Sequence, residues 1–145
     1  MLRGGGADLG SQVMKSNRLP PAKNPLEGIE YYERNLKLMR AIAGEYNARP
    51  ASEKQSKYVS DLQINGANGE ITLTTATAVA GLPTAVLSKT LVLTPNVQNA
   101  ALAAGVAGAV DWGCSSTSAQ IAAARGLVVV TLGTLPAKYA PAECR

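Results

Sequence analysis

Few residues of this chain could take part in chemistry, and the most reactive of them are two cysteines, Cys114 and Cys144. Three serines, Ser115, Ser116 and Ser118, follow the first cysteine and resemble a cluster of nucleophiles. A serine nucleophile needs a base beside it, but the chain has no histidine, and no lysine lies near these serines in the sequence. We therefore expect solvent-facing loop residues or acceptors for O-linked glycan, and no catalytic residue.

The same composition argues against a metal or cofactor site. Two cysteines are too few for a thiolate-only zinc site, and they lack the CxxC spacing. The ten Asp and Glu residues are scattered along the chain. The sequence thus predicts no metal ligand, no cofactor and no enzyme.

The two cysteines are either a structural disulfide or two free thiols of a cytosolic protein, and we favour the disulfide. It would close a loop over residues 115–143, which on the chain-entropy account stabilises the fold by roughly 3–4 kcal/mol. A disulfide implies export to an oxidising compartment. The chain begins with a polar, Gly-rich stretch instead of an apolar signal segment, and no run of 18 apolar residues could span a membrane. Either the native start has been removed or the export argument is wrong; we favour the first.

Length and composition predict one globular domain. Hydrophobic residues make up 46% of the chain, yet aromatic residues make up only 4% and Phe is absent, so the core must be built from small aliphatic side chains. Residues 1–24 show no periodicity and are predicted to be an atypical, flexible extension, with the globular domain at 25–145. The net charge of +4 arises before residue 61, and the neutral remainder suits packing against copies of the same chain.

An amphipathic helix is predicted from Glu27 to Asn47, between Pro25 and Pro50. Its apolar residues recur at alternating spacings of three and four, and Leu38 and Ile42 widen the stripe. The simplest interpretation is that the stripe covers a sheet, and the alternative is a coiled-coil or filament seam. The seam residues are Ile29, Tyr32, Leu36, Met39, Ala43 and Tyr46.

Beyond the helix the periodicity changes to two, which is typical of strands. Alternating runs on either side of Asn65–Gly69 predict a β-hairpin. Further strands are expected at Thr90–Thr94, ended by Pro95, and at Ala109–Cys114, with a short apolar strand or buried stretch at Leu127–Leu132. One helix followed by several strands predicts an α+β fold, with the amphipathic helix packed across an antiparallel sheet.

Four segments in this order resemble a type IV major pilin: GEITLTT at 69–75, KTLVLTP at 89–95, GAVDWGC at 108–114 and LPAKYAPAECR at 135–145. Ser88 stands where the family pattern has Gly. The resemblance covers about residues 57–145, with weaker agreement through the preceding helix. It implies a helix across a four-stranded antiparallel sheet and a C-terminal disulfide-bonded loop.

The resemblance also implies a function. Type IV pilins are exported with the help of a pilus assembly machinery and self-assemble into surface filaments that serve adhesion, twitching motility and DNA uptake. The loop between the cysteines, residues 115–143 here, would be exposed on the filament. The family's Gly-Phe-Thr-Leu-Ile-Glu processing site and apolar half-helix have no counterpart in this chain, which indicates an engineered soluble headpiece, a misplaced gene start or an altered N-terminus.

A second interpretation is a pilin-like binding module that captures DNA or a host-surface ligand. Clustered basic residues would be the footprint for DNA. The basic excess lies before residue 61 and aromatic residues are few, so we rank this interpretation below the structural one.

Overall fold

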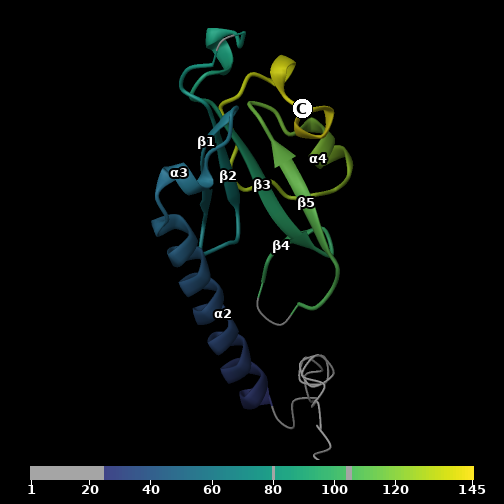
Figure 1. The fold of residues 1–145 in the computed structure, drawn as a ribbon. Helices are drawn as coiled ribbons and strands as arrows, with labels where there is room; N and C mark the ends of the chain where they lie inside the picture. The colour runs from purple at the N-terminus through teal and green to yellow at the C-terminus, as the bar shows by residue number, and fades with distance from the viewer. Residues whose placement is uncertain (1–24, 80, 104–105) are drawn as a thin grey trace, which may run out of the picture.

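The computed structural model describes residues 25–79, 81–103 and 106–145. The predicted helix is confirmed as α2 (Pro25–Ala48), and the short helix α3 (Ala51–Lys54) follows Pro50. Figure 1 shows α2 projecting beyond the sheet, with its C-terminal end beside the first strand, β1 (Val59–Ile64). The predicted extension over residues 1–24 lies outside the described residues. Within the described part of the chain, no helix is long and apolar enough to cross a membrane.

The strands form one antiparallel sheet, in which β3 (Thr90–Val97) lies between β2 (Ile71–Thr75) and β5 (Val110–Ser115). The predicted hairpin is confirmed: β1 and β2 pair from Ile64 opposite Ile71, and Gly69 in their turn has a φ of 75°, which glycine adopts without strain. The two-residue β4 adds a fifth strand at the end of β3. The strands are β1 (Val59–Ile64), β2 (Ile71–Thr75), β3 (Thr90–Val97), β4 (Ala100–Ala101) and β5 (Val110–Ser115).

The third strand continues beyond the predicted end. We expected Pro95 to close it, yet β3 runs through Pro95 to Val97. On one side of β3, pairing with β2 ends at Leu93 and pairing with β4 begins only at Asn96, so Pro95 lies in the gap between them. A proline is tolerated there because no neighbouring strand needs the N–H that it lacks.

The C-terminal part is more structured than the expected loop. It contains α4 (Gln120–Ala124) and the 3₁₀ turns η2 (Ala137–Tyr139) and η3 (Ala142–Cys144). The stretch Leu127–Leu132 is not a strand, which corrects that part of the expectation. Leu127 is buried, but Val128, Val130 and Leu132 are exposed. The run does not pair as a strand because side chains of the sheet occupy its backbone groups.

The core consists of small residues, as the lack of Phe predicts. One buried cluster joins Val86, Leu135, Ala140 and Cys144, and the half-buried Leu91 and Cys114 pack against it. The opposite face of β3 carries Val92, Thr94 and Asn96, all buried. The disulfide-bonded C-terminus therefore supplies part of the core on one face, while polar side chains fill the other.

Candidate functional site

The helix α2 carries an exposed apolar ridge beside its contact with the β1–β2 turn. Leu38, Met39 and Ile42 are 59%, 60% and 55% exposed, whereas Ala43 is buried against the β1–β2 turn. Residues of one helix that lie three and four positions apart share a face. The ridge, Leu38, Met39 and Ile42, is therefore one continuous apolar strip.

The predicted seam is divided by the structure. Ala43 is buried, Leu36 and Tyr46 are half-buried, and Met39 is exposed. The side chains of Ile29 and Tyr32 lie outside the described part. Leu36, Met39 and Ala43 line a groove of about 220 Å³, together with the turn at 64–69 and Leu102. The role of the seam in contacts between copies remains a prediction.

Polar contacts that the sequence did not reveal fix the helix to the sheet. The side-chain amide of Asn47 donates to the Ile64 carbonyl at 2.7 Å and accepts from the Ile64 N–H at 2.8 Å. Lys54, whose side chain is only 3% exposed, lies 2.8 Å from Asp61 Oδ1 and also donates to the Asn47 carbonyl. Hydrogen bonds from Lys54 and Gln63 hold the pKa of the Asp61 carboxyl below its ordinary value.

The cysteines form a disulfide between β5 and η3. Cys114 and Cys144 are joined, with Cα atoms 4.6 Å apart. The Ser116 N–H donates to the Cys144 carbonyl at 3.0 Å, and the Ile121 N–H donates to the Arg145 carbonyl at 2.9 Å. The bridge and these bonds tie the end of the chain to β5 and α4.

The serines that follow Cys114 are not loop residues open to solvent, which corrects the expectation for two of them. Ser115 and Ser116 are both 0% exposed. Ser115 Oγ donates to the Thr131 carbonyl at 2.9 Å, and Ser118 is half-buried. Ser115 and Ser116 are thus parts of the fold, because an enclosed hydroxyl cannot accept a glycan.

A buried carboxylate lies where β2 begins, and nothing in the sequence pattern singled it out. Glu70 accepts hydrogen bonds from Asn68 Nδ2 at 2.8 Å, Thr94 Oγ1 at 2.9 Å and both the N–H and the hydroxyl of Thr131 at 3.1 and 3.0 Å. Burial alone would raise the pKa of the Glu70 carboxyl, but these hydrogen bonds outweigh it and lower that pKa.

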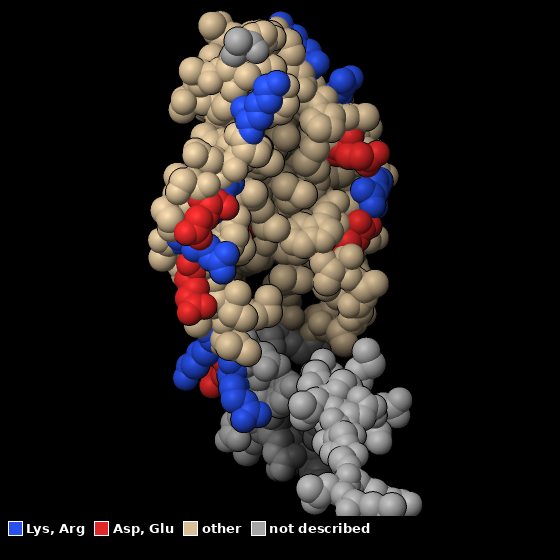
Figure 2. Space-filling view, in the orientation of Figure 1, with Lys and Arg blue, Asp and Glu red and all other residues tan. Residues whose placement is uncertain are grey.

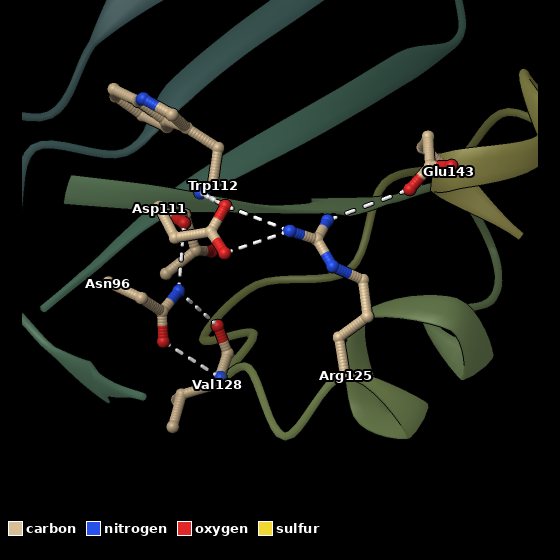
Figure 3. Close-up of polar contacts among 7 residues, drawn as sticks. Asn96, Asp111, Trp112, Arg125, Val128 and Glu143 are labelled. Atoms are coloured by element: carbon tan, nitrogen blue, oxygen red, sulfur yellow. Dashed lines mark hydrogen bonds and ion pairs between the residues drawn. The ribbon is translucent and has the colours of Figure 1, made fainter. Parts of the chain in front are cut away.

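Figure 3 shows a second set of polar contacts around β5. Arg125, which follows α4, binds both carboxylate oxygens of Asp111 at 3.0 and 2.8 Å and lies 3.6 Å from Glu143. All three side chains are exposed, so this set adds little stability. In the same view, Asn96 binds the backbone of Val128 through two hydrogen bonds.

Charged side chains lie around the rim of the face in Figure 2, and its centre is uncharged. Among the described residues, no three His, Cys, Asp or Glu side chains gather in a way that could hold a metal ion. The described part of the chain presents three candidate contact surfaces: an apolar ridge on α2, a groove beside it and a disulfide-bonded C-terminal segment.

Comparison with known proteins agrees with this arrangement. Residues 29–145 match the Pilin family, described as a bacterial filament. A type IV pilin of Pseudomonas aeruginosa strain Pa110594, known from a crystal structure, is 32% identical, with a TM-score of 0.60 over 74% of this chain and 78% of that one. No curated protein sequence matches the chain. The resemblance found in the four sequence segments is thereby confirmed. This chain belongs to the pilin family and is a type IV pilin, a structural subunit that self-assembles into an extracellular filament on the bacterial surface.

Proposed function

We propose that the filament built from this subunit serves adhesion, twitching motility and DNA uptake, and that copies meet along the apolar ridge of α2. The observation that carries the assembly contact is the exposure of Leu38, Met39 and Ile42, each more than half exposed on one helix. Burying a large aliphatic side chain contributes about 1.5–3 kcal/mol. Three such residues on one strip give neighbouring copies a strong reason to associate there.

The exposure of this ridge in the single subunit supports the proposed contact. Asn47 and Ala43 attach the adjacent side of the helix to β1 and the β1–β2 turn. The helix α2 projects beyond one end of the sheet, and the C-terminus lies at the opposite end (Figure 1). We infer that α2 faces the interior of the filament, while the segment between the cysteines, residues 115–143, faces outward. The assembly machinery is the second partner that this role requires.

A test of the assembly contact uses the full-length protein in its parent bacterium. Met39→Glu together with Ile42→Glu places two charges on the ridge, and we expect surface filaments, counted by electron microscopy, and twitching zones to fall at least tenfold. Glu45→Gln, an exposed change on the same helix, is the matched control and should leave both unchanged. Because the ridge residues are exposed, the purified double variant should melt at the temperature of the parent. Normal filament numbers in the double variant would overturn the proposed contact.

The individual activities need their own readouts. A strain without the gene should lose twitching, adhesion and DNA uptake, and the unaltered gene should restore all three. If filaments return but one activity does not, that activity does not belong to this subunit.

Capture of DNA by the subunit itself is the second candidate, and a specific observation supports it. Tyr58 and Tyr139 are 50% and 40% exposed, and each has the preceding lysine near its ring, Lys57 Nζ at 5.0 Å and Lys138 Nζ at 4.8 Å from the ring centroids. In such a pair the lysine can bind a DNA phosphate, and the tyrosine ring offers a surface on which a base can stack. Labelled DNA should bind at low salt and be released as salt rises. Replacing both lysines by Gln should weaken binding, and absence of binding at low salt would exclude this role.

A further inference from the structure

The turn between β1 and β2 contains two Asn-Gly pairs, Asn65 with Gly66 and Asn68 with Gly69. In such a pair the backbone nitrogen of the glycine can attack the side-chain amide carbon of the asparagine, because glycine has no Cβ to obstruct the approach. The new C–N bond closes a succinimide ring. Water accepts the backbone proton and returns one to Nδ2, which leaves as ammonia. A further water molecule opens the ring to aspartate or iso-aspartate, so the reaction needs no reagent besides water.

At Asn68 the fold holds both groups that this reaction needs. The nucleophile there, the Gly69 N–H, donates to the Asn65 carbonyl at 2.8 Å. The leaving group, Asn68 Nδ2, donates to Glu70 Oε2 at 2.8 Å. Glu70 is only 4% exposed and is itself fixed by the hydroxyl of Thr94. Ring closure at Asn68 must therefore first break two hydrogen bonds of the folded turn.

At Asn65 the corresponding groups are not held. Among the described residues, the Gly66 N–H donates to no acceptor and Asn65 Nδ2 has no partner, and Asn65 is exposed to water. The one hydrogen bond of the Asn65 side chain favours the reaction. The Ala67 N–H donates to Asn65 Oδ1 at 2.9 Å, and this oxygen gains negative charge when the glycine nitrogen adds to the amide carbon. A backbone N–H directed at such an oxygen lowers the barrier, as in an oxyanion hole.

The peptide bond that would be altered lies where the turn packs against α2. A Cβ placed on Gly66 would lie 3.6 Å from the Cα and Cγ of Arg40 and 3.7 Å from the Cβ of Ala43, which is 5% exposed. Asn65 and Gly66 also line the groove beside α2. Iso-aspartate carries its side-chain methylene in the main chain, so it lengthens the turn at this contact.

We propose that Asn65 is a site of spontaneous deamidation, at which the folded subunit converts to aspartate and iso-aspartate as it ages, while the fold protects the neighbouring Asn68. The iso-aspartate form has a longer main chain under α2 and a weaker contact between α2 and the turn. The inference concerns the single subunit and does not depend on which activity the filament serves.

Mass spectrometry of the ageing protein tests the site. The folded protein, with its disulfide intact, is kept in warm neutral buffer, sampled over weeks and digested at mildly acidic pH. Trypsin releases residues 58–89, which contain both pairs, and fragment ions locate each gain of one mass unit. We expect deamidation at Asn65 to be at least about tenfold faster than at Asn68. In guanidinium chloride with reductant the two rates should converge. Equal rates in the folded protein, or no reaction at Asn65 while the denatured chain reacts, would overturn the proposal.

The matched variant is Gly66→Ala, because the structure leaves room for it. The atoms nearest to an added Cβ lie at ordinary contact distance, and Gly66 is not among the residues with a positive φ. The variant should therefore fold like the parent. Its Cβ obstructs the attacking nitrogen, so deamidation at Asn65 should slow by at least about tenfold. Persistence of the parent rate would show that the ring does not form through Gly66.

The effect on α2 is measured on the aged protein. The iso-aspartate form is isolated by chromatography and identified by enzymatic methylation of its free α-carboxylate. The Ile64 N–H donates to Asn47 Oδ1 at 2.8 Å, and its hydrogen exchange should be at least about tenfold faster in this form than in the parent. Asn65→Asp carries the same charge on a main chain of normal length and should keep the parent's protection. Equal exchange in the iso-aspartate form, Asn65→Asp and the parent would overturn the proposed weakening of the contact.

Discussion

The side-chain amide of Asn47 pairs with the backbone of Ile64 as a neighbouring strand would, donating to its carbonyl at 2.7 Å and accepting from its N–H at 2.8 Å. Asn47 lies in the last turn of α2, and Ile64 ends the outer strand β1. Because the pairing uses both backbone groups of Ile64, it fixes the position of the helix and covers the end of an exposed sheet edge. The ridge on α2 is oriented by this contact.

Replacing Asn47 by Ala should loosen the helix from the sheet. Both polar groups of Ile64 lose their partner, and since they are only partly buried, we expect the free energy of unfolding to fall by about 1–2 kcal/mol. Urea unfolding followed by circular dichroism measures the change. Glu45→Ala, at an exposed position of the same helix, should change stability by less than about 0.5 kcal/mol. Equal effects of the two substitutions would show that the Asn47 contact does not hold the helix.

Breaking the disulfide should cost much of the stability of the domain. The bridge between Cys114 and Cys144 spans a sequence separation of 30, for which the chain-entropy account predicts about 3–4 kcal/mol. Cys144 is also buried in the core cluster. The free energies of unfolding measured with and without reductant should differ by this amount. The intact mass should rise by about two mass units on reduction. A double Cys→Ser variant should match the reduced protein, and an unfolding curve that does not respond to reductant would contradict the prediction.

The elements of the fold were predictable because their signals are local. The α2 stripe, the Asn/Gly-rich hairpin turn and the alternating strands each follow from a few consecutive residues. The end of β3 was not predictable, because whether Pro95 is tolerated depends on which strand lies beside it, a non-local fact. The same holds for Leu127–Leu132, an apolar run that indicates a strand locally but is bound by side chains from β3 and β5 and by Glu70, which precedes β2.

The candidate sites were predictable to a smaller extent. The cysteine pair could be inferred from the sequence, but Ser115 and Ser116 were expected at the surface and are buried. Small polar residues favour loops on average, and only the packing of Thr131 and Cys144 around these two serines reverses that preference. The functions of Asn47, Glu70 and Asn96 could not be foreseen, because each binds a backbone group 17 or more residues away.

Glu70 should make the stability depend on acid. Hydrogen bonds from Asn68, Thr94 and Thr131 lower the pKa of its carboxyl in the folded state below the ordinary value near 4.5. The unfolded chain therefore binds this proton first, so the stabilisation is full above the ordinary pKa and is lost as pH falls through the folded-state pKa. Melting temperatures measured from pH 7 to pH 3 should drop below about pH 4.5.

The variant Glu70→Gln isolates this contribution. It should be less stable than the parent at pH 7, and the difference should shrink toward pH 3, where the parent carboxyl becomes protonated. Asp61, whose pKa is also lowered, remains in both proteins and accounts for the acid dependence that persists. Parallel curves for parent and variant at every pH would show that Glu70 does not titrate with folding.

Two glycines should respond to the same substitution with opposite signs. At Gly133 a Cβ would fall against the Thr90 carbonyl oxygen and 2.9 Å from the Ser115 carbonyl oxygen, both of which belong to strands and cannot move aside. Gly133→Ala should therefore lower the free energy of unfolding by about 3 kcal/mol or more.

At Gly44, inside α2, an added Cβ meets no atom within 4 Å. Gly44→Ala should raise the free energy of unfolding by about 1 kcal/mol, because alanine loses less backbone entropy than glycine in a helix. Urea unfolding of both variants beside the parent measures the two changes. A gain of stability from Gly133→Ala would mean that the chain after Leu132 does not lie against β3 and β5 as described. A loss of stability from Gly44→Ala would mean that this side of α2 is covered.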